Sequence, residues 1–493
     1  MTRRQVENER APTGVHGLDV ILGGGLFANA IYMVSGRPGA GKTILSNQIA
    51  TAHVRRGGRA VYATLLAETH ARLIAQLRVL SFFDEKAVGK ELHYLSALEA
   101  VTEGGLKGLL ELVRRMVRDQ KATLLVLDGM VTAETLAKSA DEYKRFISEL
   151  QTWITVVGCT VIIVTSSMGT VSPEHTMVDG IIDLGSERFE MRNLRHVTVT
   201  KLRGTAFLEG QHSYLITQDG LVVYPRTEAR VRPDGVEPSS ERLPTGVRNL
   251  DGALGGGIVA QSTTLLLGSS GAGKTVMGLQ FLAEGARRGE KCLHFGFYEP
   301  PSSIIGKADR LGLDFSGLID QGHLFIKWFR PAEILIDALV DTLLDIVRTN
   351  MIKRLFIDGF VGFRSTHPSD RVSPVFSAVT DELFSLGVTT LISDETRELF
   401  IRDVAVPTAN VSAIFHNILF MRQVEVDAEL MRLLSVMKTR DSAADRQLWR
   451  YDIGDGGVEL VAPFEPEGRR LMTGGGGAGG KPSRTRTARR KGR

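Results

Sequence analysis

A duplicated glycine-rich segment constrains this chain more than any other feature. Residues 36–43 read GRPGAGKT and residues 268–275 read GSSGAGKT, so one pattern, Gly-x-x-x-x-Gly-Lys-Thr, returns after 232 positions. In each copy an apolar, strand-like run precedes the glycines and a helix-like segment follows them. This order is typical of a phosphate-binding loop, in which backbone N–H groups at the start of a helix converge on phosphate oxygens.

Each residue type in the loop has a chemical reason to be there. The glycines allow the tight turn, the lysine reaches the β- and γ-phosphates, and the threonine hydroxyl is a ligand for Mg²⁺. We therefore predict two ATP sites, each with Mg²⁺. The predicted nucleotide-binding residues are Gly36, Gly39, Gly41, Lys42, Thr43, Gly268, Gly271, Gly273, Lys274 and Thr275.

The repeat extends well beyond the two loops. PTGVHGLDVILGGGL at residues 12–26 returns as PTGVRNLDGALGGGI at residues 244–258, with the same offset of 232. Farther along, KATLLVLDG and MIKRLFIDG are apolar strands that end in Asp-Gly. Their carboxylates, Asp128 and Asp358, are predicted to hold Mg²⁺ through a water or through the loop threonine. A duplicated domain explains all of these matches together.

Strand-like and helix-like segments alternate in each copy, which predicts an α/β fold with a mostly parallel sheet and helices on both faces. HSYLITQDGLVVYP and QLWRYDIGDGGVELV read as hairpins that append antiparallel strands to each sheet. The predicted organisation is an N-terminal extension at 1–11, domains at 12–228 and 244–466, a linker at 229–243 rich in proline and charge, and a tail at 467–493.

Composition is ordinary except at the C-terminus. The hydrophobic share of 43% and the charged share of 24% are those of a globular protein. The two cysteines lie in apolar runs and favour neither a disulfide framework nor a zinc site, which suits a reducing cytoplasm. No apolar run reaches membrane-spanning length. We therefore expect a cytoplasmic protein that does not associate with a membrane.

The tail accounts for the positive net charge of the chain. From Leu471 onward it carries seven basic residues and no acidic ones, and subtracting them from the net +4 leaves the rest at −3. A Gly- and Arg-rich segment is expected to be disordered, either as a solubilising tail or as a weak binder of nucleic acid or another polyanion.

Taken together, these motifs resemble the KaiC family of double-domain, RecA-like P-loop ATPases, over roughly residues 10–465. The resemblance rests on TGVxxLDxxLGGG, both P-loops and a KLRG segment. It implies two tandem RecA-like domains, a homohexameric double ring with ATP between neighbouring subunits, hydrolysis in both rings, and autophosphorylation in the second. An unidentified signalling protein is the expected partner.

The resemblance also assigns catalytic carboxylates, although the match is incomplete. The family carries paired Glu residues after the second strand, which activate the attacking water. In AVYATLLAETH only Glu68 matches, with Ala67 in front of it, and in HFGFYEPPSS only Glu299 matches, with Tyr298 in front of it. Glu68 and Glu299 are therefore the candidate bases; the alternative is an ordinary acidic residue in the first turn of a helix.

KLRG resembles the basic pair that family members extend to the ATP of the neighbouring subunit. This assigns Lys201 and Arg203, with Lys438 and Arg440 in KTRD as their counterparts, as phosphate contacts made in trans. Alternating basic residues on a strand otherwise belong to its solvated face.

The autokinase segment matches least well. In PTANVSAIFHNILF, Ser412 takes the position of the family's serine, whereas Ala413 replaces the threonine and His416 replaces the aspartate. Ser412 is the candidate phosphorylation site; the alternative is a serine in a loop leading into a strand.

Three functions compete at this stage. The first is a KaiC-like regulatory ATPase ring with serine autokinase activity, and the second is a RecA-like ATPase that acts on DNA. The third is a scaffold that binds ATP without turnover, which the missing first Glu of both domains favours.

Overall fold

The computed structural model describes residues 10–67, 70–166, 173–189, 191–230, 237–330, 334–364, 369–396, 414–426, 429–440 and 447–464. Glu68, Ser412 and the predicted tail at 467–493 lie outside the described residues. The chain divides into two compact units between residues 231 and 232, with residues 335–341 grouped with the first unit. The predicted domain limits at 12–228 and 244–466 stay predictions.

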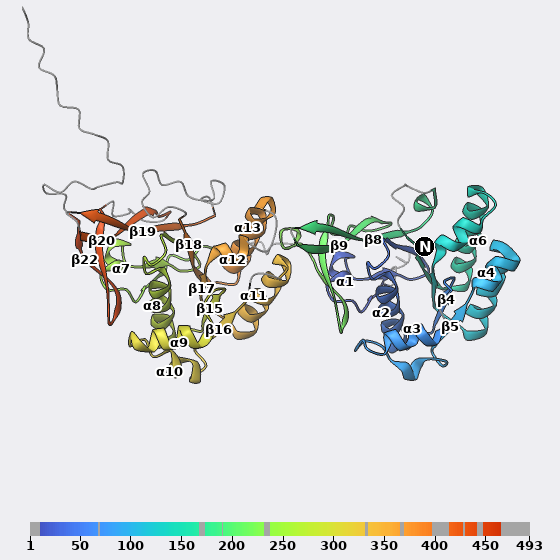
Figure 1. Ribbon diagram of the computed structural model, residues 1–493, viewed down its shortest axis with the longest axis horizontal. Coiled ribbons are helices and arrows are strands. Elements are labelled where there is room, and N and C mark those ends of the chain that lie inside the picture. Colours follow the sequence, from blue (N-terminus) through green and yellow to red (C-terminus); the bar gives the residue numbers. More distant parts are fainter. Residues whose placement is uncertain are drawn as a thin grey trace, which may run out of the picture. The chain divides into compact units, whose positions relative to one another are not determined.

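The first unit is built on one large sheet, with nine strands among the described residues, in the order β5-β4-β6-β7-β3-β8-β9-β10-β11 (Figure 1). The strands from β5 to β8 run parallel and β9, β10 and β11 follow antiparallel. Their bounds are β3 Ile31–Gly36, β4 Ala60–Thr64, β5 Leu92–Ser96, β6 Leu124–Asp128, β7 Thr160–Val164, β8 Gly180–Phe189, β9 Arg192–Leu202, β10 His212–Thr217 and β11 Gly220–Tyr224.

The second unit repeats this order strand for strand, as β16-β15-β17-β18-β14-β19-β20-β21-β22 among its described residues. The strands from β16 to β19 are parallel, and β20, β21 and β22 are antiparallel. Their bounds are β14 Thr263–Gly268, β15 Cys292–Gly296, β16 Leu324–Trp328, β17 Arg354–Asp358, β18 Thr389–Glu395, β19 Asn417–Val426, β20 Glu429–Lys438, β21 Trp449–Gly454 and β22 Gly457–Pro463.

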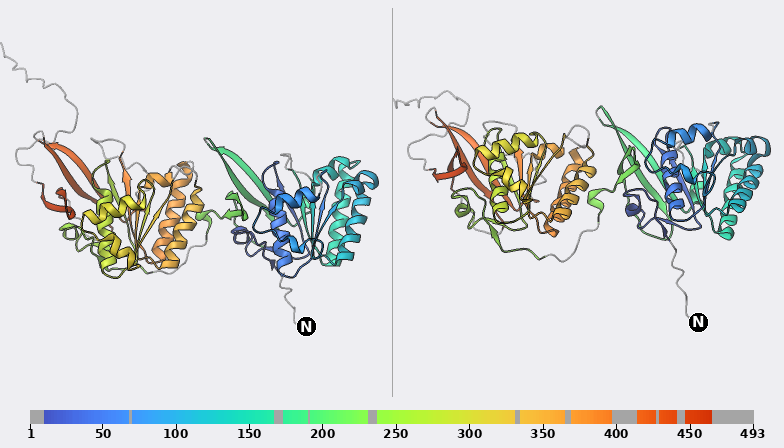
Figure 2. Two further views of the ribbon diagram at one scale, coloured as in Figure 1. Left: turned by 60° about the horizontal axis from the view of Figure 1, so that its bottom comes forward. Right: turned by 90° about the horizontal axis from the view of Figure 1, so that it is seen from below.

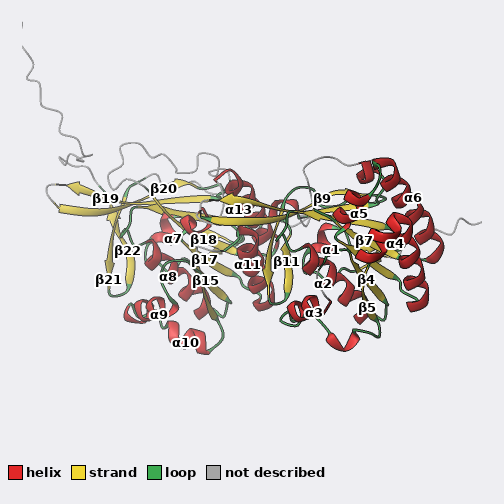
Figure 3. Cartoon of the chain, turned by 45° about the vertical axis from the view of Figure 1, so that its right-hand side comes forward, coloured by secondary structure: helices red, strands yellow, loops and turns green. Residues whose placement is uncertain are grey.

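Helices cover both faces of each sheet, as the three ribbon views show (Figures 1, 2 and 3). In the first unit one core cluster joins α1 and α2 to the sheet, and another joins α4, α5 and α6 to its opposite face. The helices of this unit are α1 Leu18–Ile21, α2 Lys42–Arg55, α3 His70–Leu77, α4 Leu98–Gln120, α5 Met130–Leu136 and α6 Ala140–Val157.

In the second unit α7 to α10 pack into a core cluster on one face of the sheet, and α12, α13 and the part of α11 after residue 341 lie on the other side (Figures 1 and 3). These helices are α7 Leu250–Ala253, α8 Lys274–Arg287, α9 Pro301–Arg310, α10 Phe315–Asp320, α11 Ile336–Asn350, α12 Phe360–Arg364 and α13 Ser369–Ser385. Every residue of β3, β6 and β14 is buried, because a parallel sheet covered on both faces leaves its central strands no contact with water.

Short elements complete the described secondary structure. A two-stranded pairing leads into each P-loop strand, β1 Arg10–Ala11 with β2 Leu26–Phe27 and β12 Arg242–Leu243 with β13 Ile258–Val259. Single turns of 3₁₀ helix span Glu85–Ala87, Pro173–Thr176 and Thr227–Ala229. The predicted fold class, two tandem α/β domains with RecA-like parallel sheets and appended antiparallel hairpins, is confirmed.

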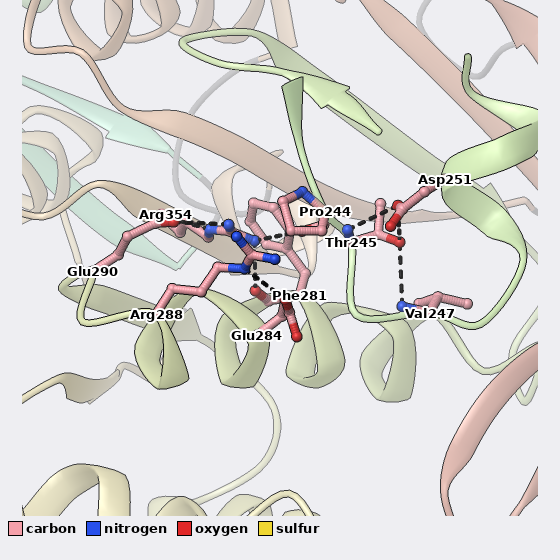
Figure 4. Close-up of polar contacts among 9 residues, drawn as sticks. All are labelled: Pro244, Thr245, Val247, Asp251, Phe281, Glu284, Arg288, Glu290 and Arg354. Atoms are coloured by element: carbon pink, nitrogen blue, oxygen red, sulfur yellow. Dashed lines mark hydrogen bonds and ion pairs between the residues drawn. The ribbon is translucent and has the colours of Figure 1, made fainter. Parts of the chain in front are cut away.

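A buried arginine joins several segments of the second unit at the start of β17 (Figure 4). The Arg354 side chain is fully buried, and its Nε and Nη2 donate to Glu290 over 2.7 and 2.9 Å. Its Nη1 donates to the carbonyl of Pro244 over 2.7 Å, and the guanidinium lies over the ring of Phe281. The bidentate pair and the carbonyl contact supply the partners that a buried charge requires.

Candidate functional site

Both glycine-rich loops run from the end of a buried strand into the start of a helix, as predicted. In the first unit β3 ends at Gly36 and α2 begins at Lys42; in the second β14 ends at Gly268 and α8 begins at Lys274. No side chain caps either helix start, so its first N–H groups are available to an anion.

The residue before each helix is a glycine whose backbone conformation disfavours any side chain. Gly41 and Gly273 have φ of 94° and 93°, a left-handed backbone that side chains disfavour. A Cβ on Gly41 would lie 2.9 Å from Ile216, and a Cβ on Gly273 would lie 2.6 Å from Ile453. These isoleucines come from the appended hairpins, which therefore pack closely on the loops.

Each hairpin is also hydrogen-bonded to its loop. The Tyr214 hydroxyl donates to the Ala40 carbonyl and the Tyr451 hydroxyl donates to the Ala272 carbonyl, both over 2.6 Å and both buried. The Gln48 amide of α2 pairs with the backbone of Leu221 in β11, and Gln280 of α8 pairs in the same way with Val458 of β22. The hairpins thus fix the position of both loops.

The loop lysines contact the carbonyls of their own loops. Lys42 Nζ donates to Gly36 O over 2.7 Å, and Lys274 Nζ donates to Gly268 O over 3.0 Å. Burial lowers the pKa of both ammonium groups. A phosphate group beside these side chains would bring the charge partner that the carbonyl oxygens do not supply.

The predicted Mg²⁺ ligands come together in both units. Thr43 Oγ1 donates to Asp128 Oδ2 over 3.1 Å, and Thr275 Oγ1 donates to Asp358 Oδ2 over 2.9 Å. A hydroxyl and a carboxylate side by side form the all-oxygen donor set that suits Mg²⁺, with nucleotide phosphates and water as the remaining ligands. The residues present therefore fit the cation.

The two carboxylates differ in what else they contact. In the first unit the Tyr62 hydroxyl donates to Asp128 Oδ2 over 2.7 Å, and Ser46 Oγ lies 3.1 Å from the same hydroxyl. Burial raises the pKa of Tyr62 well above its usual value, so the phenol stays a donor. Burial also raises the pKa of Asp128, and the bonds from Tyr62 and Thr43 only partly offset this.

In the second unit a histidine takes the place of the tyrosine. His294 Nε2 lies 3.8 Å from Asp358 Oδ2, which is too long for a hydrogen bond, and both buried ring nitrogens are without a hydrogen-bond partner. Ser393 Oγ instead donates to Asp358 Oδ1 over 2.6 Å. Burial pushes the pKa of Asp358 upward, but His294, Ser393 and Thr275 outweigh it, so the pKa lies below its usual value.

Tyr62, His294 and Ser393 were not predicted from the sequence. Tyr62 and His294 are 232 positions apart, the same offset as the loops, and that match is the signal that was available. Ser393 had no comparable signal, because the residue at its place in the first unit is the apolar Val164.

A cavity lies over each loop. The first is about 440 Å³ and is lined by Lys42, Thr43 and Asp128 among others, together with Thr165 and Ser166 after β7. The second is about 520 Å³ and is lined by Lys274, Thr275 and Asp358 and also by Glu299, Lys307 and Glu395. Cavities of this size in contact with both loops and both carboxylates are suited to a small phosphorylated ligand.

The candidate base Glu299 lines the second cavity but is engaged by two residues of α9, the helix that follows it. Lys307 Nζ donates to Glu299 Oε1 over 2.6 Å, and Ser303 Oγ donates to Glu299 Oε2 over 3.0 Å. The other candidate base, Glu68, lies outside the described residues. The catalytic role of both therefore stays a prediction.

The predicted trans contacts lie at or just after the ends of β9 and β20. Lys201 Nζ donates to the carbonyls of His175 and Thr176, and Arg203 forms an ion pair with Asp179 at 3.4 Å. Lys438 Nζ donates to the carbonyl of Phe415, and Arg440 follows β20. Of the described residues that line the two cavities, none belongs to these basic pairs.

The described helices include none that combines the length and the hydropathy needed to cross a bilayer. Ser412, the candidate phosphorylation site, lies outside the described residues.

Comparison with known proteins gives a consistent result. A family model described as "ATPase: KaiC" matches twice, over residues 11–228 and 243–465. A circadian clock oscillator protein KaiC of Picosynechococcus is 26% identical over 490 residues, which cover 92% of this chain and 90% of that protein. The circadian clock oscillator protein KaiC 1 and the circadian clock protein KaiC3 of Synechocystis are 25% and 24% identical, each over 92% of this chain.

Proposed function

We propose a function for this chain from one premise: it belongs to the KaiC family of ATPases. In our proposal both units bind and hydrolyse ATP with Mg²⁺, in a ring formed by copies of the same chain. The nucleotide state of the ring then sets which signalling partner it binds. The observation that carries the proposal is that both loops keep the lysine, the threonine hydroxyl and the carboxylate together.

The steps follow from these residues. The N–H groups at the starts of α2 and α8 bind the phosphates, and Lys42 and Lys274 exchange their loop carbonyls for phosphate oxygens. Thr43 with Asp128, and Thr275 with Asp358, hold the cation. Mg²⁺ when bound neutralises charge on the β- and γ-phosphates during transfer.

We further propose that Lys201, Arg203, Lys438 and Arg440 contact the ATP of a neighbouring subunit in a homohexamer. Support comes from their absence among the described residues that line the cavities of their own units. Positive charge supplied across a subunit interface would make assembly depend on nucleotide and would stabilise the transferring phosphoryl group.

Serine autokinase activity in the second unit is a finer proposal, with Ser412 as the acceptor. It is supported by the place of Ser412 in a segment that resembles the family's phosphorylation site. A scaffold without turnover is the second candidate for the second unit, because Lys307 pairs with Glu299 there.

Incubation with Mg²⁺ and γ-labelled ATP tests these proposals together. We expect label in free phosphate from wild type and from each of Lys42→Ala and Lys274→Ala, and none from the double variant. Label in protein that disappears in Ser412→Ala establishes the autokinase, and phosphate release without protein label rejects it. ATP binding with neither free labelled phosphate nor labelled protein would contradict the proposed ATPase activity and support the scaffold that binds ATP without turnover.

A further inference from the structure

We propose that Glu395, rather than Glu299, is the base of the second nucleotide site. This inference rests on the proposed function, since it names the residue that takes the proton from the attacking water. The water oxygen forms its bond to the γ-phosphorus while its proton passes to the Glu395 carboxylate. The bond from the γ-phosphorus to the bridging oxygen breaks and its electron pair leaves with ADP; the proton then passes to phosphate or solvent.

The first observation is that Glu299 is already occupied. Its Oε1 accepts from Lys307 Nζ over 2.6 Å and its Oε2 accepts from Ser303 over 3.0 Å, so both carboxylate oxygens are engaged. These two direct hydrogen bonds hold the carboxylate toward α9, so Glu299 must leave both partners before it can turn to a water beside the γ-phosphate.

The second observation is the position of Glu395. It is the last residue of β18, the strand that lies between the P-loop strand β14 and the strand that ends in Asp358. In the parallel register Glu395 lies opposite Gly268, the first glycine of the loop, and Ser393 lies opposite Asp358. The strand order thus places this carboxylate at the carboxyl end of the parallel strands, where the phosphates are proposed to bind.

The third observation is that Glu395 faces the cavity and is accessible. It lines the second cavity, its side chain is 56% exposed, and Oε1 lies 3.9 Å from Lys274 Nζ. Lys274 is the group that contacts the β- and γ-phosphates when nucleotide is bound. A carboxylate this close to that ammonium group can reach a water beside the γ-phosphate, directly or through a second water.

The first unit lacks these features, which makes the assignment specific to the second. Continuing the register of β3 with β7 places Ser166 at the position of Glu395, and Ser166 lines the first cavity. A serine hydroxyl does not accept a proton at neutral pH. At the 232-residue offset that relates Tyr62 to His294, Ala75 stands where Lys307 does in the second unit. The first unit is therefore expected to rely on Glu68.

Single-site kinetics in the full-length chain test the assignment. In a Lys42→Ala background, which silences the first site, we expect Glu395→Gln to lower kcat about 100-fold or more, the typical share of a general base. KM and the affinity for a fluorescent ATP analogue should stay within about threefold, because the carboxylate acts on the water. Asp320→Asn, an exposed acid on α10, is the matched control and should match the parent.

Glu299→Gln is the competing variant in the same background. A loss that is larger for Glu299→Gln than for Glu395→Gln overturns the proposal and leaves the ATPase function in place. A Glu395→Gln variant that weakens analogue binding while kcat is kept also overturns it, because the residue would then act in binding. If the Lys42→Ala parent binds the analogue but releases no phosphate, the proposed function of the second site fails, and this proposal fails with it.

Chemical rescue separates proton transfer from a merely structural role. Formate added to Glu395→Ala supplies a small carboxylate to the space that the side chain leaves, and we expect it to restore at least tenfold in kcat. No rescue in a variant that unfolds at the same temperature as the parent contradicts the base assignment. Formate should leave the Asp320→Asn control unchanged.

Discussion

The two units share one strand order and one loop geometry, yet the polar groups around those shared parts differ. In register with the strand that ends in the aspartate, Tyr62 lies opposite Val126, and His294 lies opposite Phe356. The tyrosine hydroxyl reaches its carboxylate, whereas the shorter imidazole stops at 3.8 Å. Duplication has kept the frame predicted to hold the phosphates and has changed the residues that contact the strand-end carboxylate, Asp128 in one unit and Asp358 in the other.

The opposite end of the sheets shows the same divergence. Arg354 begins β17 in the second unit, where Leu124 begins β6 in the first, and its partner Glu290 takes the place of Gly58. At this end the first unit has the buried Leu124 with a hydrogen bond between His53 and Thr123 beside it, whereas the second unit has a buried ion pair. A comparison of the units therefore separates what the fold requires from what each site has acquired.

The largest effect is expected from breaking the ion pair. Glu290→Leu should lower the free energy of unfolding of the second unit by about 3 kcal/mol, because it leaves the fully buried Arg354 without its carboxylate. Urea unfolding followed by tryptophan fluorescence in a Trp153→Phe background measures this unit through Trp328 and Trp449.

The matched double variant, Glu290→Leu with Arg354→Met, should return most of that stability, since both charges are removed together. If Glu290→Leu alone unfolds at the same urea concentration as the wild type, the carbonyl of Pro244 and the ring of Phe281 are enough to stabilise the buried guanidinium.

The next largest effect concerns the tyrosine contact. In a Lys274→Ala background, Tyr62→Phe should lower Mg²⁺-dependent phosphate release at the first site about 10- to 100-fold, the range for a lost partner of a metal-ligating carboxylate. His294→Phe in a Lys42→Ala background should cost less, because His294 lies 3.8 Å from Asp358 and the two hydroxyl donors to that carboxylate, Ser393 and Thr275, remain. Equal losses at the two sites would refute the contrast drawn between them.

A smaller effect is expected at Ser393. Ser393→Val copies Val164 of the first unit and removes one donor to Asp358, worth about 1 kcal/mol or about a fivefold weaker apparent Mg²⁺ affinity. Titration of Mg²⁺ against ATP-analogue binding measures it. Val164→Ser is the reciprocal variant and should strengthen the affinity of the first site; no change in either direction would show that the two flanking residues are equivalent.

The smallest effect near neutral pH is a difference between the two sites in how turnover depends on pH. This difference should grow as the pH falls. The pKa of Asp128 is raised by burial and that of Asp358 lies below its usual value, so Asp128 takes up its proton at the higher pH. As pH falls, Mg²⁺-dependent turnover should be lost first in Lys274→Ala, which retains only the first site, and later in Lys42→Ala. Phosphate release measured from pH 7 downward checks the order, and the reverse order would contradict it.

The sequence allowed the fold and the centre of each site to be predicted, because both depend on local patterns that occur twice. The Gly-x-x-x-x-Gly-Lys-Thr loops, the strands ending in Asp128 and Asp358 and the two hairpins each have a recognisable pattern that returns in the same order in the second unit. The contacts of Ser393 and Lys307 were not predictable in this way. They depend on which strands become neighbours and on side-chain reach across a cavity, which spacing along the chain does not encode.

The hydroxyl bonds from Tyr214 to Ala40 and from Tyr451 to Ala272 have a consequence for the order in which the protein is made. Each joins residues far apart in the chain, 174 and 179 positions respectively. During synthesis a phosphate-binding loop emerges early but is held in place only when the last hairpin of its own domain follows. Because Tyr214 precedes residue 268, the first loop acquires this support on the ribosome before the second loop has been translated.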